Sequence, residues 1–131
     1  MIRQLRTVRN AALAILITVL LTACGNEGPG DAFHEFMDRV YAGETTQARE
    51  YMANESIPLQ GGEERALATL RQLSREIGAV LDYIEITEEE IQGELATLHV
   101  TFYYTDDSTE EDSYHMIKED GQWKFFPPGL R

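Results

Sequence analysis

The period of the hydrophobic pattern changes once along the chain, close to Gly78, and this change limits the possible folds more than any other feature. Before it, apolar residues recur at positions i, i+3, i+4, i+7 and i+8 of one helix face, namely Phe33, Phe36, Met37, Val40 and Tyr41. After it, apolar and polar residues alternate, as they do in a half-buried strand. Helices followed by a run of strands predict an α+β fold, with the helices packed on one face of an antiparallel sheet.

The pattern predicts three helices and four strands. The helices cover residues 31–41, a short segment from 45 or 46 to about 52, and 63–77, with Asp31 as an N-cap and Gly43 and Gly78 as helix ends. The strands cover 80–87, 95–105, 111–118 and 122–126, and together form a four-stranded meander. The acidic runs at 88–90 and 106–112 are interpreted as solvated hairpin tips.

The first 24 residues have the layout of an export signal. Three arginines open the chain, an apolar run follows at 11–21, and small residues lead to Cys24, the single cysteine of the sequence. The apolar run is shorter than the roughly 20 residues that a membrane-spanning helix needs. Residues 21–24, Leu-Thr-Ala-Cys, resemble the bacterial lipobox. The resemblance implies that the Cys24 thiol is acylated and that cleavage leaves Cys24 as the first residue.

The predicted organisation is therefore a signal at 1–23, a lipidated cysteine and flexible tether at 24–30, and one domain at 31–131. The membrane is contacted through a lipid anchor. Gly25, the residue after the cysteine, indicates the periplasmic face of the outer membrane if the cell has two membranes, and the outer face of the plasma membrane otherwise. Two alternatives remain open, a free cysteine in an ordinary secreted protein and an uncleaved membrane anchor.

The charge balance excludes one class of partner. The sequence has 11 Lys and Arg against 23 Asp and Glu, a net charge of −12, and the three arginines of the signal are lost on cleavage. A mature chain with so large an excess of acids lacks the basic patches that bind nucleic acid. It is also unsuited to lying flat on anionic lipid.

Four segments together resemble a known group of proteins. They are Phe33-x-x-Phe36, Tyr41-Ala42-Gly43-Glu44, the segment 48–52 (AREYM) and the hairpin 117–124 (IKEDGQWK). They are similar to the small cystatin-like, nuclear-transport-factor-2-like lipoproteins of the domain-of-unknown-function 4878 type. The resemblance implies a cone-shaped fold, with a curved sheet wrapped on helices and often paired through that sheet. It implies no particular molecular mechanism.

The predicted interior offers no group for general acid–base catalysis. The inward face of the strand at 95–105 carries one hydroxyl and no acid or histidine. Four tyrosines are candidates for lining a pocket, namely Tyr41, Tyr51, Tyr104 and Tyr114. We therefore expect a non-enzymatic binding or assembly domain without a cofactor. The alternative is a cone-fold enzyme of the isomerase or cyclase type that acts on a small apolar substrate.

The outward face of the sheet mixes apolar and polar side chains, which is typical of an interface. The candidates are Leu95, Thr97, His99, Thr101, Tyr103, Ile117 and Phe126. A second copy of the chain or another envelope protein would bind there, unless the tail at 127–131 covers the face. His99 and His115 are expected on adjacent strands of this face, close enough to approach one another. The spacing of the histidines matches no metal motif, so no metal is expected.

Overall fold

The structure is a computed structural model that describes residues 27–128, so the predicted signal, Cys24 and the first part of the predicted tether lie outside the described residues. The helices are α2 (Pro29–Tyr41), α3 (Thr45–Arg49) and α4 (Glu63–Val80), with two short 3-10 turns, η1 (Asn54–Ser56) and η2 (Pro58–Gln60), between α3 and α4. The strands are β1 (Leu81–Gln92), β2 (Leu95–Tyr104), β3 (Thr109–Glu119) and β4 (Gln122–Phe126). This order confirms the predicted α+β class.

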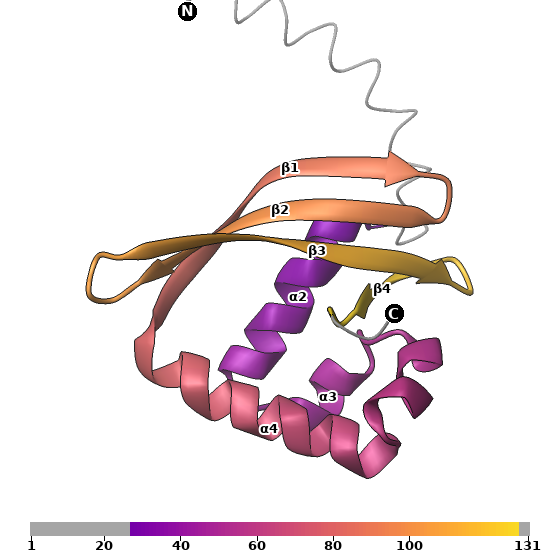
Figure 1. Ribbon diagram of the computed structural model, residues 1–131, viewed down its shortest axis with the longest axis horizontal. Coiled ribbons are helices and arrows are strands. Elements are labelled where there is room, and N and C mark those ends of the chain that lie inside the picture. The colour runs from indigo at the N-terminus through magenta and orange to yellow at the C-terminus, as the bar shows by residue number, and fades with distance from the viewer. Residues whose placement is uncertain (1–26, 129–131) are drawn as a thin grey trace, which may run out of the picture.

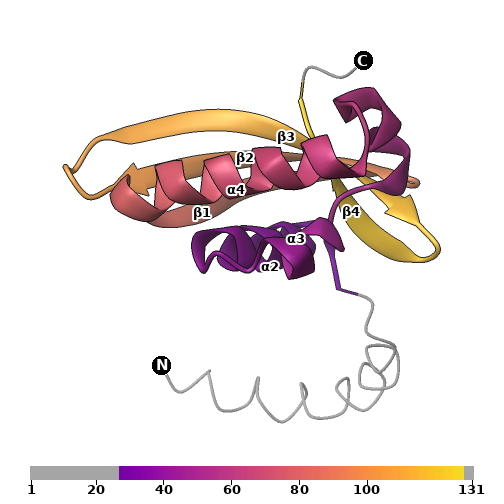
Figure 2. The ribbon, with the colours of Figure 1, turned by 90° about the horizontal axis from the view of Figure 1, so that it is seen from below.

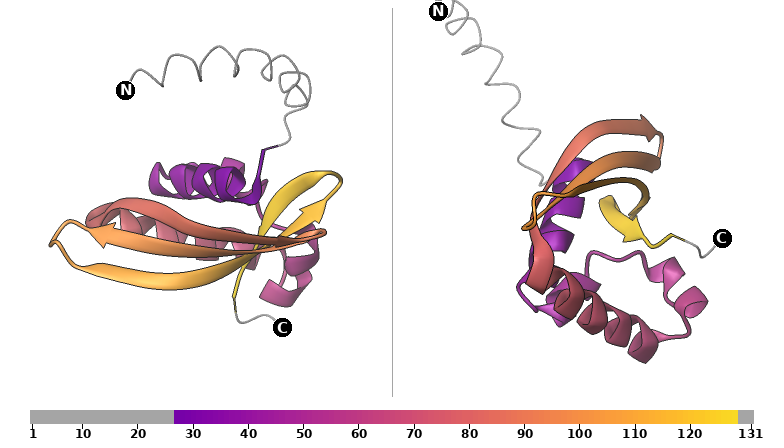
Figure 3. Two further views of the ribbon diagram at one scale, coloured as in Figure 1. Left: turned by 90° about the horizontal axis from the view of Figure 1, so that it is seen from above. Right: turned by 60° about the vertical axis from the view of Figure 1, so that its left-hand side comes forward.

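The four strands form one antiparallel sheet in the order β1-β2-β3-β4, which confirms the predicted meander. Figure 1 shows the sheet as a curved layer with α2 crossing behind it and α4 running below. Helix α2 contacts β1, β2 and β4, whereas α4 packs on α2 and α3. The α2–α3 pair is seen from below in Figure 2, and the curl of the strands around α2 is clearest in Figure 3. None of the described helices is both long and apolar enough to cross a membrane.

Aromatic rings fill the space between α2 and the sheet. Phe36 stacks on Phe125 with ring centroids 4.7 Å apart, and Phe33 stacks on Tyr114 at 5.3 Å. The inward residues predicted for the second strand are buried, namely Ala96, Leu98, Val100 and Phe102. Half-buried residues of α4, among them Leu67, Leu73 and Ile77, pack against the same core. The cone is therefore filled by its own side chains.

The outer edge of β4 is covered by the segment that follows α3. Met52 makes a parallel bridge to Phe125. The backbone N–H of Ala53 donates to the Phe125 carbonyl at 2.8 Å, and the N–H of Phe125 donates to the Tyr51 carbonyl at 2.7 Å. Strand β1 forms the opposite edge of the sheet.

Helix α2 begins two residues before the predicted start. Its N-cap is Gly28, not Asp31, and Pro29 and Gly30 are buried within it rather than part of the tether. Proline is well suited to a first helical position, because its missing N–H would have no partner there. A side chain at Gly30 would displace the Glu89 carboxylate, since its Cβ would lie 2.5 Å from Glu89 Oε2.

The two predicted helix ends have different outcomes. Gly43 has a φ of 81°. Its N–H donates to the Val40 carbonyl, and the Glu44 N–H donates to the Arg39 carbonyl. These two bonds make a Schellman motif, so Gly43 ends α2 as predicted. The prediction for Gly78 is wrong, because α4 continues through it to Val80.

The first acidic run is not a hairpin tip. Strand β1 extends to Gln92, and Glu88, Glu89 and Glu90 pair with residues of β2. A register shift between Ile86 and Glu88 separates two regular parts of the β1–β2 ladder. The prediction of a short strand is wrong because the hydrophobic alternation stops at the edge of the core while the backbone pairing continues. Strand β3 also begins earlier than predicted, at Thr109.

Candidate functional site

The four tyrosines predicted to line a pocket lie in different surroundings. Tyr41 is 49% exposed. Tyr114 is half-buried among the core rings, where burial raises the pKa of its hydroxyl. Tyr104 donates to Glu110 Oε1 at 2.7 Å, and partial burial together with this hydrogen bond raises the pKa of Tyr104 to about 12. Tyr51 is half-buried beside α2. The structure does not bring the four hydroxyls together.

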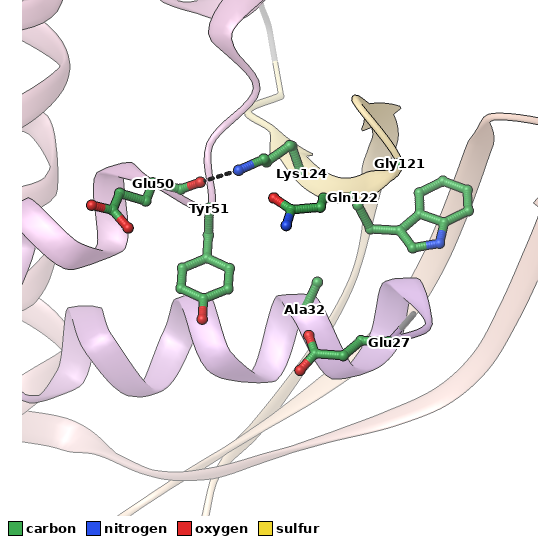
Figure 4. A pocket seen from close by; sticks show the side chains of 8 residues that line it. Glu27, Ala32, Glu50, Tyr51, Gly121, Gln122 and Lys124 are labelled. Carbon is green, nitrogen blue, oxygen red and sulfur yellow. Dashed lines mark hydrogen bonds between the residues drawn. The ribbon is translucent and has the colours of Figure 1, made fainter. Parts of the chain in front are cut away.

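Tyr51 lines a hollow of about 300 Å³ near the start of the described chain. Figure 4 shows this hollow between the start of α2, the end of α3 and β4, where Lys124 Nζ donates to the Glu50 carbonyl. The indole ring of Trp123 is already covered by Lys118 Nζ, 5.3 Å from the ring centroid. The lining residues are Glu27, Ala32, Glu50, Tyr51, Gly121, Gln122, Trp123 and Lys124. The carboxylates of Glu27 and Glu50 thus line the hollow together with the Tyr51 hydroxyl and the Lys124 amine.

The candidate interface residues lie on the sheet face opposite α2. Leu95 is 59% exposed, whereas Thr101 and Phe126 are only 9% and 8% exposed. Thr97, His99, Tyr103 and Ile117 are half-buried. Tyr103 stacks flat on Tyr83 of β1 at 4.3 Å, and its hydrogen bond to Glu85 raises the pKa of Tyr103. This outer face therefore carries an aromatic pair and one exposed leucine among acidic and polar groups.

The register of the sheet separates the two histidines of the outer face. His99 pairs with Ser113, and His115 pairs with Thr97. Each imidazole faces a hydroxyl across the ladder, with His99 Nδ1 3.1 Å from Ser113 Oγ and His115 Nδ1 3.4 Å from Thr97 Oγ1. Each imidazole therefore has a hydroxyl as its cross-strand partner, and the two histidines are not paired with one another.

The other nitrogen of His99 meets the acidic end of β1. Nε2 lies 3.2 Å from Glu90 Oε2. Glu88, which pairs with His99 across the ladder, completes a group whose ligand atoms all lie within 4.8 Å of one another. Among residues 27–128, these three side chains are the group placed to hold a metal ion. Sequence reasoning placed His99 on this face but missed Glu88 and Glu90, because it ended the strand before them.

Ser113, His99 and Glu90 also form a hydroxyl–imidazole–carboxylate chain, the arrangement used by nucleophilic enzymes. Such a mechanism needs donors for the oxyanion that develops in the transition state. Here the backbone N–H of Ser113 is bound by Asp112 Oδ1 at 2.9 Å. Asp112 and Glu111 also line the adjacent hollow. Negative charge in this position would destabilise an oxyanion.

Comparisons with known proteins agree on the fold. A family model described as "Domain of unknown function (DUF4878)" matches residues 22–126. A similar solved structure comes from Campylobacter jejuni and is called a "Putative NTF2-like transpeptidase". It is 19% identical to this chain, with a TM-score of 0.61 over 76% of this chain and 97% of that one. At this identity the likeness shows the fold alone. Among curated proteins, none matches the sequence significantly.

Proposed function

The chain belongs to the family described as "Domain of unknown function (DUF4878)" and has the NTF2-like fold, and from this premise we propose that it is a lipid-anchored, non-enzymatic binding domain of the bacterial cell envelope. It binds a protein partner, either a second copy of itself or another envelope protein. The outer face of the sheet makes the contact, and Cys24 carries the anchor.

One observation carries the proposal: the cone is filled from within. Phe33, Phe36, Phe102, Tyr114 and Phe125 form a continuous set of ring contacts between α2 and the sheet. An enzyme of this architecture would need a substrate cavity with a titratable group inside it. The buried core of the described chain contains no acid and no histidine. Function is therefore assigned to a surface.

The outer face is favoured over the other surfaces because of what it exposes. The Tyr83–Tyr103 pair presents two stacked rings, with Tyr83 54% exposed. Tyrosine combines a large apolar area with a hydroxyl, and it is enriched where proteins meet. Leu95 adds an exposed apolar side chain on the same face. The surrounding acids suit another envelope protein with basic groups better than a second copy of the same acidic face, since complementary charge steers association.

An enzymatic role is the competing proposal, and two observations bear on it. The Campylobacter jejuni protein is called a transpeptidase, and the Ser113–His99–Glu90 chain contains the groups that acyl transfer uses. The Asp112 carboxylate on the Ser113 N–H argues against it, as does the acidic hollow beside the hydroxyl. Binding is therefore the function that the geometry supports better.

The proposal is tested with two leucines of matched exposure. Leu95 lies at the start of β2 on the outer face and is 59% exposed; Leu59 lies in η2 and is 55% exposed. The full-length chain is purified in detergent from its own membranes as wild type, Leu95→Asp and Leu59→Asp, and the mass of each complex is measured by light scattering. We expect a complex larger than one chain for wild type and Leu59→Asp, and a single chain for Leu95→Asp.

The measured mass also identifies the partner class. A complex of two chains means self-pairing, and a larger stoichiometric complex with a second protein means a heterologous partner. The proposal is wrong if wild type is a single chain, or if the two leucine variants behave alike.

A further inference from the structure

We propose that Glu88, Glu90 and His99 form a binding site for one divalent transition-metal ion, Zn²⁺ foremost, on the outer face of the sheet. All three side chains come from one chain, so the proposed protein partner supplies no ligand. It joins the acidic end of β1 to the middle of β2.

The distances suit an ion of this size. Ligands that surround Zn²⁺ tetrahedrally at about 2.0–2.2 Å from the metal are separated from one another by roughly 3.4 Å. His99 Nε2 and Glu90 Oε2 are 3.2 Å apart. One ligand atom from each of Glu88, Glu90 and His99 lies within 4.8 Å of those of the other two. The three side chains are therefore close enough to share one ion.

The irregular register of β1 is what assembles the group. Ile86 pairs with the inward residue Val100, and the next paired residue is Glu88, opposite the outward residue His99. One extra residue, Thr87, is thus inserted between an inward and an outward position. With regular pairing, Thr87 would stand opposite His99 and Glu88 would face the interior. The bulge therefore turns Glu88 and Glu90 towards the imidazole.

Ser113 is placed to hold the imidazole of His99 when a metal ion is bound. Its hydroxyl lies 3.1 Å from Nδ1, on the far side of the ring from the carboxylates. In metal sites the non-coordinating nitrogen of a ligating histidine usually donates to an oxygen of this kind, which orients the ring and selects the tautomer. With a metal ion on Nε2, the ring proton would be on Nδ1, where Ser113 Oγ accepts it. Ser113 acts here as a positioning residue.

The donor set selects the class of metal. An imidazole nitrogen suits Zn²⁺ and its transition-metal neighbours, whereas Ca²⁺ and Mg²⁺ prefer shells built only of oxygen. Two carboxylates and a neutral imidazole balance the charge of one divalent ion. Solvent water can complete the shell, because the side chains of Glu88 and Glu90 are exposed.

His115 provides a matched control for His99. It is on the same face, and its Nδ1 meets a hydroxyl in the same way, but it is not part of the group around Glu88 and Glu90. Glu94, in the turn between β1 and β2, is a control for the loss of one negative charge on the same edge of the sheet.

The test is isothermal titration calorimetry of the full-length chain in detergent with ZnCl₂. Every protein carries Cys24→Ser, so that the thiol contributes no ligand. We expect one Zn²⁺ per chain, at least tenfold weaker binding for His99→Asn and for Glu90→Gln, and less than twofold change for His115→Asn and Glu94→Gln. Ser113→Ala should weaken binding by about tenfold, as the loss of a hydrogen-bond partner of a ligating histidine does. Far-UV circular dichroism checks that each variant is folded.

Three results would overturn the inference. The first is no saturable binding of Zn²⁺ by the parent chain. The second is equal weakening by His99→Asn and His115→Asn, or by Glu90→Gln and Glu94→Gln, which would mean that the ion responds only to the acidic surface. The third is Ca²⁺ binding as tightly as Zn²⁺, which would remove the role of the imidazole.

Discussion

Tyr104 is a single residue whose ionisation reports directly on its surroundings. Its hydroxyl is partly buried and donates to a carboxylate, and both effects favour the neutral form, so its pKa rises to about 12. In the unfolded chain it would ionise near the ordinary value of about 10. Between these two values the unfolded state has lost the proton and the folded state has kept it. Stability from this group is therefore complete below about pH 10 and falls as the pH rises towards 12.

The prediction is a late step in the ultraviolet titration of tyrosinate. Compared with wild type, Tyr104→Phe should lose a component that ionises near pH 12, and the same titration in urea should show no such difference in midpoint. If Tyr104→Phe keeps the late component at its wild-type size, the pKa of Tyr104 is not raised by its burial and its hydrogen bond to Glu110.

At the residue scale, the sequence predicts the buried positions of the strands but not the group around His99. The inward positions Leu98, Val100 and Phe102 could be predicted, because a period of two assigns every second side chain to one face. The group of Glu88, Glu90 and His99 could not. It depends on a one-residue irregularity in pairing, and no local property of the sequence at 86–88 distinguishes a bulge from a strand end.

At the scale of whole elements, Gly43 and Gly78 have the same sequence signature and opposite structural roles. Each follows an apolar helical stripe, as a C-terminal glycine does. Gly43 has a φ of 81°, whereas Gly78 has no left-handed φ and lies inside α4 with open space around its Cα. Helix α4 continues because Leu81, three residues later, is buried in the core and fixes where the chain turns into β1. The local sequence around Gly78 does not show that Leu81 is buried, so the end of α4 could not be predicted from it.

Alanine substitutions should therefore have opposite effects at these two positions. Gly43→Ala forces a side chain into the left-handed region and should destabilise the protein by about 1–2 kcal/mol. Gly78→Ala should stabilise it by about 0.5–1 kcal/mol, because alanine is the better residue in a helix interior and no neighbour obstructs its Cβ. Urea unfolding followed by circular dichroism measures both. A loss of stability in Gly78→Ala would mean that α4 ends where the sequence pattern predicted.

At the scale of the whole molecule, the proposal combines a filled cone with a membrane anchor. The described chain begins at residue 27, and α2 begins two residues later at Pro29, so the domain starts within five residues of Cys24. A segment this short reaches less than roughly 20 Å, which would hold the domain close to the bilayer. The acidic outer face would then meet partners of the same membrane surface. The fold class could be predicted because it follows from element order, whereas partner identity is not encoded in periodicity or charge.

The most direct test of this account is photo-cross-linking in intact cells from two tyrosine positions of similar exposure. A benzophenone-bearing residue replaces either Tyr83, 54% exposed on the outer face, or Tyr41, 49% exposed at the end of α2. The account predicts one discrete adduct from position 83 and none from position 41. When Cys24→Ser is added, the position-83 adduct and the retention of the protein at the membrane should both be lost. Equal cross-linking from both positions, or an adduct unchanged without Cys24, would contradict it.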